Sequence, residues 1–263
     1  MTKKTKDFAK MTDAQQSDAL WARAYKMPTI EKATRHAARL NHALSLSDGE
    51  RLPFCFGNDR CNCLSCPPCR TRGQRNFMFE MLELIENRGG SEAWRAITIV
   101  PEFGKTEVGE LPKGDFRGFG NQVARALREL NPGTVAAFCI DMSLVRMVGQ
   151  KEFWQTHAHG FIWDQEMQSL DELRSRFAWR DKSDGSCLRP VKVVNLSDPL
   201  GWSSYSAKPQ FGMREQHADE TGELKYVKKR LTIDQELMFV RALSPFRVSR
   251  RFFTVGLKKS KSK

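Results

Sequence analysis

Two histidines separated by a single residue have the types and spacing needed to bind a metal ion. They are His157 and His159, and they lie in the segment 153–163, which reads Phe-Trp-Gln-Thr-His-Ala-His-Gly-Phe-Ile-Trp. Its aromatic and β-branched residues and its lack of proline predict a β-strand. Because side chains alternate across a strand, both imidazoles lie on one face and can bind one ion. The alternative is two exposed polar residues on a half-buried strand.

Five of the seven cysteines lie within fifteen residues and form a second candidate metal site. They are Cys55, Cys61, Cys63, Cys66 and Cys69. The last two have the Cys-x2-Cys spacing that lets two thiolates bind one zinc ion, and a second pair comes from Cys55 with Cys61 or Cys63. We therefore predict a structural zinc knuckle made by four of the five. The alternative is a cluster of buried or redox-active thiols.

The charge of the chain indicates a polyanionic partner. Lysine and arginine total 43 against 31 acidic residues, for a formal net charge of +12. Nucleic acid is the usual partner of such a protein, although a ribosomal or membrane-surface protein has the same charge. Arg70, Arg72 and Arg75 directly follow the cysteines. We expect these three side chains to lie at the edge of the knuckle and to contact phosphates.

A tyrosine and a lysine downstream have the spacing of a nucleophile and its helper. Tyr205 and Lys208 lie three residues apart in an expected helix, on one face. A phenol needs a nearby cation or base to act as a nucleophile near neutral pH, and a lysine ammonium also stabilises charge on an attacked phosphate. The alternative is a tyrosine at a helix edge and a lysine that interacts with the helix C-terminus. Tyr226 and Lys229 repeat the spacing.

Apolar patterns predict the elements that hold these residues. Helices are expected at 12–25, 30–46, 74–87, 116–130, 169–179, 200–208 and 232–243, and strands at 94–100, 134–145, 153–163, 190–194 and 252–256, with a polar loop at 212–230. We expect strands 134–145 and 153–163 to form a hairpin that places Asp141 beside the histidines. The order of these helices and strands along the chain predicts an α+β fold, with a mostly antiparallel central sheet and helices on one face.

Taken together, these residues resemble the HUH endonuclease superfamily, in particular the rolling-circle replication initiators of small plasmids and phages. The resemblance rests on His157-Ala-His159 and on Tyr205-Ser-Ala-Lys208, in that order, with the strand 94–100 similar to the first motif strand. It covers about residues 94–210, and cysteine-rich knuckles also precede the nuclease core in relatives. The resemblance implies an HUH/RRM-like nuclease core, with Asp141 as the third ligand of Mg²⁺ or Mn²⁺.

By this resemblance, the protein nicks and rejoins single-stranded origin DNA to initiate rolling-circle replication. Tyr205 would attack the phosphate and form a 5′-phosphotyrosine, with Lys208 assisting. The implied partners are single-stranded or supercoiled origin DNA, a host polymerase and a host helicase, since no phosphate-binding loop for nucleotide-driven unwinding is present. The alternatives are a relaxase or single-strand transposase with the same chemistry, or a non-catalytic zinc-knuckle regulator that binds nucleic acid.

The sequence also predicts how the chain is divided and where the protein acts. We expect an N-terminal helical section with a disordered basic start at 1–54, the zinc knuckle at 55–73, the nuclease domain at 74–257 and a basic tail at 258–263. No signal peptide follows the first residues, and no apolar run approaches the roughly 20 residues of a membrane span. We therefore expect a protein of the bacterial host cytoplasm with no membrane partner, where reduced cysteines bind metal.

Overall fold

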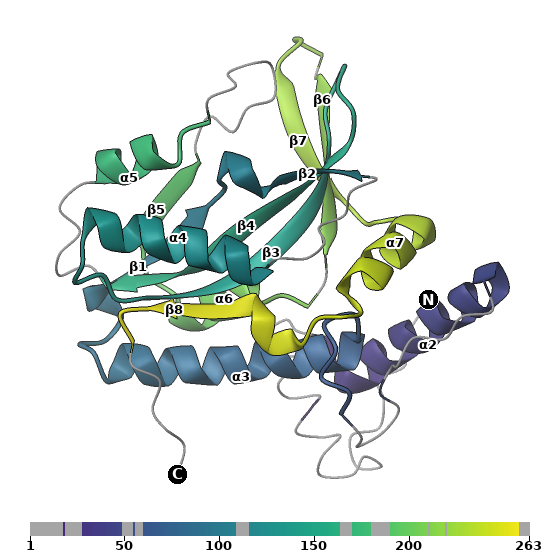
Figure 1. Ribbon diagram of the computed structural model, residues 1–263, viewed down its shortest axis with the longest axis horizontal. Helices are drawn as coiled ribbons and strands as arrows, with labels where there is room; N and C mark the ends of the chain where they lie inside the picture. Colours follow the sequence, from purple (N-terminus) through teal and green to yellow (C-terminus); the bar gives the residue numbers. More distant parts are fainter. Residues whose placement is uncertain are drawn as a thin grey trace.

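A curled mixed sheet forms the centre of the protein (Figure 1). The computed structural model describes residues 18, 28–48, 55, 60–108, 116–163, 170–179, 190–209, 211–218 and 220–257. The strands are β1 (Trp94–Ile99), β2 (Lys105–Glu107), β3 (Ala136–Arg146), β4 (Phe153–Trp163), β5 (Val191–Asn195), β6 (Gly212–Ala218), β7 (Leu224–Lys229) and β8 (Phe252–Val255). Their order is β5-β1-β4-β3-β6-β7, with β2 on β4 and β8 on β3. Of the described pairings, only β3 with β6 is parallel.

Six α-helices in the described part of the chain make this an α+β fold. They are α2 (Ile30–Asp48), α3 (Pro67–Glu86), α4 (Phe116–Leu130), α5 (Leu170–Arg176), α6 (Pro199–Ser206) and α7 (Ile233–Leu243). Short 3₁₀ turns are η2 (Ser91–Ala93), η3 (Glu102–Gly104) and η6 (Val248–Arg251). None of the described helices has both the length and the apolar character needed to cross a membrane.

The expectation that the helices lie on one face of the sheet is wrong. Val123 and Leu127 of α4 pack in the same core as Ile140 of β3, whereas Phe77 of α3 packs with Ala137 in a second core on the opposite face. Figure 1 shows α4 and α3 on opposite sides of the central strands. The physical reason is that β3 and β4 are buried along almost their whole length, so both faces of these strands need a cover.

The expected hairpin of β3 and β4 is confirmed. Asp141 lies directly opposite His157 in the antiparallel register, and Cys139 lies opposite His159. Directly opposed residues of an antiparallel pair project from the same face, so the aspartate and both histidines share one face.

Several other expected elements differ from the structure. The polar stretch 212–230 is not a loop but contains β6 and β7, which the apolar pattern missed because polar residues occupy both faces of these strands. Strand β2, which follows β1, was not expected, and α6 ends at Ser206 rather than at Lys208. Helix α3 begins at Pro67 and crosses the expected boundary at residue 73, because proline is tolerated in a first helical turn. The expected helix 12–25 and both tails fall almost wholly outside the described residues.

Gly160, directly after His159, lies where no side chain fits. A Cβ added there would lie 2.1 Å from Ala137 O and 2.9 Å from Phe138 Cα, both backbone atoms of β3. Gly160→Ala is therefore expected to destabilise the protein by about 1–3 kcal/mol, measured by urea unfolding. The matched control is Gly212→Ala in β6, where the nearest heavy atom to the added Cβ is Lys229 O at 3.8 Å. Equal loss of stability in both variants would contradict the close approach of β3 to Gly160.

Candidate functional site

Asp141, His157 and His159 converge in one buried cluster. The Asp141 Oδ2 atom lies 3.3 Å from His157 Nε2 and 4.0 Å from His159 Nε2, and all three side chains are at most 2% exposed. Both Nε2 atoms lack a hydrogen-bond partner among the described residues, whereas Asp141 Oδ2 also forms an ion pair with Lys208 Nζ. Buried polar atoms are nearly always paired, because leaving them unpaired is costly. The three side chains could hold one metal ion, whose coordination would satisfy these atoms.

Hydrogen bonds on the other ring nitrogens orient the two imidazoles. His157 Nδ1 lies 3.1 Å from Gln155 O, and a carbonyl only accepts, so His157 carries its proton on Nδ1 and presents a lone pair at Nε2. His159 Nδ1 lies 2.8 Å from Thr98 Oγ1 on β1, and a hydroxyl can accept a hydrogen bond when Nδ1 carries the proton. Such outer contacts fix the ring orientation of metal-bound histidines. The contact of Thr98 with His159 was not expected from the sequence. The position of Thr98 in the expected strand 94–100 was the one available indication.

The electrostatic environment keeps the cluster in the form that binds metal. Burial lowers the pKa of His157 and holds the pKa of His159 well below its usual value, and the charges of Lys208 and Arg214 add to both effects. Burial alone would raise the pKa of Asp141, but Lys208, His157 and Arg251 together hold it well below its usual range. At neutral pH the imidazoles are therefore neutral and the carboxylate is charged, as metal ligands must be.

Two cations flank the Asp141 carboxylate. Lys208, two residues beyond the end of α6, forms an ion pair through Nζ with Asp141 Oδ2. Arg251 Nη2 lies 3.8 Å from Asp141 Oδ1, and this guanidinium also donates to Ile140 O at 2.9 Å and to Lys208 O at 3.1 Å. Arg251 is 1% exposed. Arg251 was not expected at the site, because it lies in a basic segment of the kind usually found at a protein surface.

Helix α6 carries Tyr205 to the edge of the cluster. The Tyr205 ring centroid is 5.1 Å from that of His159, and Lys208 Nζ is 5.0 Å from the Tyr205 centroid. Two hydrogen bonds fix α6 in place. Trp202 Nε1 donates to Gly160 O at 2.9 Å, and Gln74 Nε2 of α3 donates to Ser204 O at 2.7 Å.

A cavity opens beside Tyr205. It has a volume of about 800 Å³ and is lined by Tyr205, Trp202 and Lys208 together with residues of β5 and α2, among them Asn195 and Lys32. A space bordered by aromatic rings and lysines can accept part of a nucleic-acid strand.

The second tyrosine–lysine pair lies elsewhere. Tyr226 is on β7 and is 50% exposed, whereas Tyr205 is partly buried against His159. Of these two tyrosines, only Tyr205 has a described ring contact with the histidine cluster. Lys228, next to Lys229, approaches from β7, with its Nζ 5.6 Å from the Tyr205 ring centroid.

Four cysteines form the second cluster, at the start of α3. They are Cys55, Cys61, Cys66 and Cys69, and one ligand atom from each lies within 4.8 Å of all the others. Two of the Sγ–Sγ separations are 3.5 and 3.7 Å, which match the about 3.8 Å expected between ligands of a tetrahedral zinc ion with Zn–S bonds of about 2.3 Å. The Cys61 amide donates to Cys55 Sγ at 2.9 Å, which would stabilise a thiolate. Cys63 is not in this set.

Local interactions disfavour ionisation of two thiols in this region, those of Cys63 and Cys69. A hydrogen bond with Cys66 and burial raise the pKa of Cys69, and burial with the neighbouring Cys61 raises the pKa of Cys63 to about 11. A bound Zn²⁺ would supply the charge that holds the four ligands as thiolates.

Comparison with protein-family models, with curated proteins and with solved structures finds no match for this chain. One cluster offers two neutral imidazoles and a carboxylate next to a phenol and a lysine, which suits metal-assisted attack on a phosphate. The other offers four thiols, which suits structural zinc.

The arginines after the cysteines do not all lie at an open edge, and this expectation is wrong for Arg70. Arg70 is 5% exposed; it donates to Leu64 O and Ser65 O and lies over the ring of Phe211. Its guanidinium holds the knuckle loop and cannot reach a phosphate in solution. Arg75 forms an ion pair with Asp18, and Arg72 is partly buried. Phosphate binding by these two remains a prediction.

Proposed function

We propose that this protein nicks and rejoins single-stranded DNA through Tyr205, as an initiator of rolling-circle replication. The observation that carries the proposal is the convergence of candidate ligand atoms from Asp141, His157 and His159 beside the Tyr205 ring. The cavity next to Tyr205 and the net charge of +12 support a nucleic-acid strand as the substrate.

The buried cluster would hold one divalent ion. Mixed imidazole and carboxylate ligands favour Mn²⁺ over Mg²⁺, although either suits an oxygen-rich phosphate substrate. Such an ion, when bound, would polarise the scissile phosphate and offset its negative charge. Thr98 and the Gln155 carbonyl would keep the two imidazoles aimed at it.

The protein's own groups would perform the bond exchange. The Tyr205 oxygen loses its proton and bonds to phosphorus, the bond from phosphorus to the 3′ oxygen breaks, and that oxygen takes up a proton to become a free 3′-hydroxyl. Lys208, near the Tyr205 ring, supplies positive charge for the phenolate and the phosphate. Attack of a 3′-hydroxyl on the phosphotyrosine reverses these steps and rejoins the strand.

The proposal is tested with a pool of single-stranded oligonucleotides whose central segment is randomised. In Mn²⁺ the protein is expected to form a DNA adduct that survives a denaturing gel, and sequencing the attached DNA identifies the preferred site. His157→Ala should reduce the rate by roughly 10²–10³-fold, the usual cost of losing one electrostatic contact to the transition state. His42→Ala, an exposed histidine of α2, is the matched control.

The outcomes separate the candidate functions. Adduct formation that needs no divalent metal, or that His157→Ala leaves unchanged, would overturn the proposed metal site. Tight oligonucleotide binding with no adduct in any metal would instead favour the non-catalytic zinc-knuckle regulator. A relaxase or single-strand transposase would form the same adduct.

A further inference from the structure

A two-stranded arm next to Tyr205 carries residues that the proposed chemistry does not use. β6 and β7 form an antiparallel hairpin in which Arg214 lies opposite Lys228 and Gln216 lies opposite Tyr226. Figure 1 shows this hairpin extending beyond the helices that cover the rest of the sheet.

One face of the hairpin continues the face that carries the metal cluster. β6 runs parallel to the end of β3, with Arg214 level with Val145. Val145 lies four residues after Asp141 on β3, so alternation places both on the same face. Lys228 confirms this orientation, because its Nζ lies 5.6 Å from the Tyr205 ring centroid. Arg214, Lys228 and Tyr226 therefore form a row that leads outward from Tyr205.

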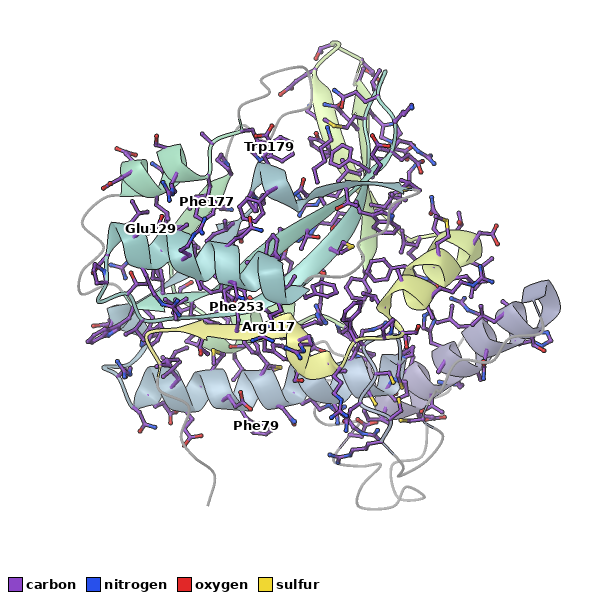
Figure 2. All side chains as sticks on the ribbon, in the orientation of Figure 1. Phe79, Arg117, Glu129, Phe177, Trp179 and Phe253 are labelled. Carbon is purple, nitrogen blue, oxygen red and sulfur yellow. The ribbon has the colours of Figure 1, made fainter. Side chains whose placement is uncertain are left out.

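The opposite face of the hairpin has a different character. It carries Glu215, whose carboxylate pairs with Arg146 at 3.1 Å, with His217 at 3.2 Å and with Lys229. Acidic and basic side chains offset one another there. By contrast, alternation places no acidic residue of β6 or β7 on the face with Arg214 and Lys228. Figure 2 shows the side chains that project from both strands of the hairpin.

We infer that the face of the β6–β7 hairpin with Arg214, Lys228 and Tyr226 binds the single strand of DNA adjoining the phosphate that Tyr205 attacks. The two cations bind backbone phosphates, and the half-exposed Tyr226 ring stacks on an unpaired base. A base inside a duplex cannot present its face to a side chain, so the strand bound here is single. This inference rests on the proposed function and extends it to the strand beyond the cleaved bond.

The inference is tested by binding alone, in a Tyr205→Phe background without divalent metal. The probe is a fluorescein-labelled single-stranded oligonucleotide of mixed sequence, about 16 nucleotides long, the upper end of common single-strand site sizes. Tyr226→Ala is expected to raise the Kd about 5- to 100-fold, the usual cost of one lost stacking contact. Tyr226→Phe keeps the ring and should restore binding.

The charge of Lys228 is tested by the salt dependence of the same binding. Lys228→Ala should reduce the slope of log K against log salt concentration by about 0.7, the value for one lost contact to single-stranded phosphate. Lys225→Ala is the matched control, because it removes the same charge from the same strand on the opposite face, opposite His217. It should leave the slope unchanged.

Each outcome bears on one claim. Equal binding by the Tyr226→Ala, Lys228→Ala and Lys225→Ala variants overturns the inference while leaving nicking by Tyr205 intact. If Tyr226→Ala raises the Kd for a labelled duplex as much as it raises the Kd for the single strand, the assignment of a single-stranded ligand is overturned. If Tyr226→Ala and Lys228→Ala weaken binding while the unaltered protein forms no adduct in any metal, the result supports DNA binding by the hairpin and overturns the proposed nicking activity.

Discussion

Tyr205→Phe is expected to abolish both strand cleavage and the covalent DNA adduct while leaving oligonucleotide binding close to that of the unaltered protein. Only the phenolic oxygen is removed, so the ring keeps its contacts with His159 and Trp202 and α6 keeps its position. Loss of a catalytic nucleophile typically lowers a rate by roughly 10⁴-fold or more. The measurement is the fraction of a single-stranded oligonucleotide that becomes attached to protein in Mn²⁺.

The chain provides its own control for this result. Tyr226→Phe removes the same oxygen from the other tyrosine–lysine pair and should retain adduct formation. Mass analysis of the unaltered protein should locate the attached nucleotide on the peptide that contains Tyr205. An adduct on the Tyr226 peptide, or cleavage that survives in Tyr205→Phe, would show that the nucleophile is misassigned.

Removing the four-cysteine cluster is expected to cost most of the stability of the protein. Cys69→Ser should lower the zinc content from about one ion per chain to near zero and reduce the free energy of unfolding by several kcal/mol, a large part of the roughly 5–15 kcal/mol typical of a domain. The loop around the cluster is held by hydrogen bonds from Leu64 N to Phe246 O and from Val248 N to Asn62 O. Elemental analysis and urea unfolding measure the two effects.

Cys63→Ser is the matched control for the cluster. Cys63 lies in the same loop but outside the set of four, and its Sγ donates to Cys61 O at 3.5 Å. It should retain zinc and nearly full stability. The His157→Ala/His159→Ala double variant should also retain zinc. If Cys63→Ser or the double histidine variant loses zinc while Cys69→Ser retains it, the zinc ligands are not the four cysteines assigned to the cluster.

Much of the candidate site was predictable because it depends on local spacing. The His-x-His alternation on one strand, and the short turn that pairs β3 with β4, follow from the order of residues and bring Asp141 opposite His157. The cysteine spacing likewise predicted a cluster, although it left open which four of the five are ligands. In the structure, the four cysteines whose ligand atoms lie within 4.8 Å of one another are Cys55, Cys61, Cys66 and Cys69, so Cys63 is outside the set.

The parts that were not predictable depend on contacts between distant segments. Arg251 reaches Asp141 only because β8 lies beside β3, and nothing in the local sequence of a basic segment indicates such burial. Arg70 looked like a surface cation, yet the packing of Phe211 beneath it makes it internal. The hairpin of β6 and β7 was missed for a related reason. Pairing to β3 defines β6, and pairing to β6 defines β7, whereas neither strand has a clear apolar pattern.

The position of Arg251 also determines when the site can form during synthesis. Ile140, whose carbonyl accepts from Arg251, precedes it in the chain by 111 residues. A ribosome adds about 5–20 residues per second, so Asp141 and the histidines leave the ribosome seconds before the arginine that pairs with the carboxylate. Phe246 and Val248, which form hydrogen bonds with the cysteine loop, are translated just before Arg251. A nascent chain that has not yet reached Arg251 therefore holds Tyr205 and the three candidate ligands without the guanidinium that lies beside Asp141.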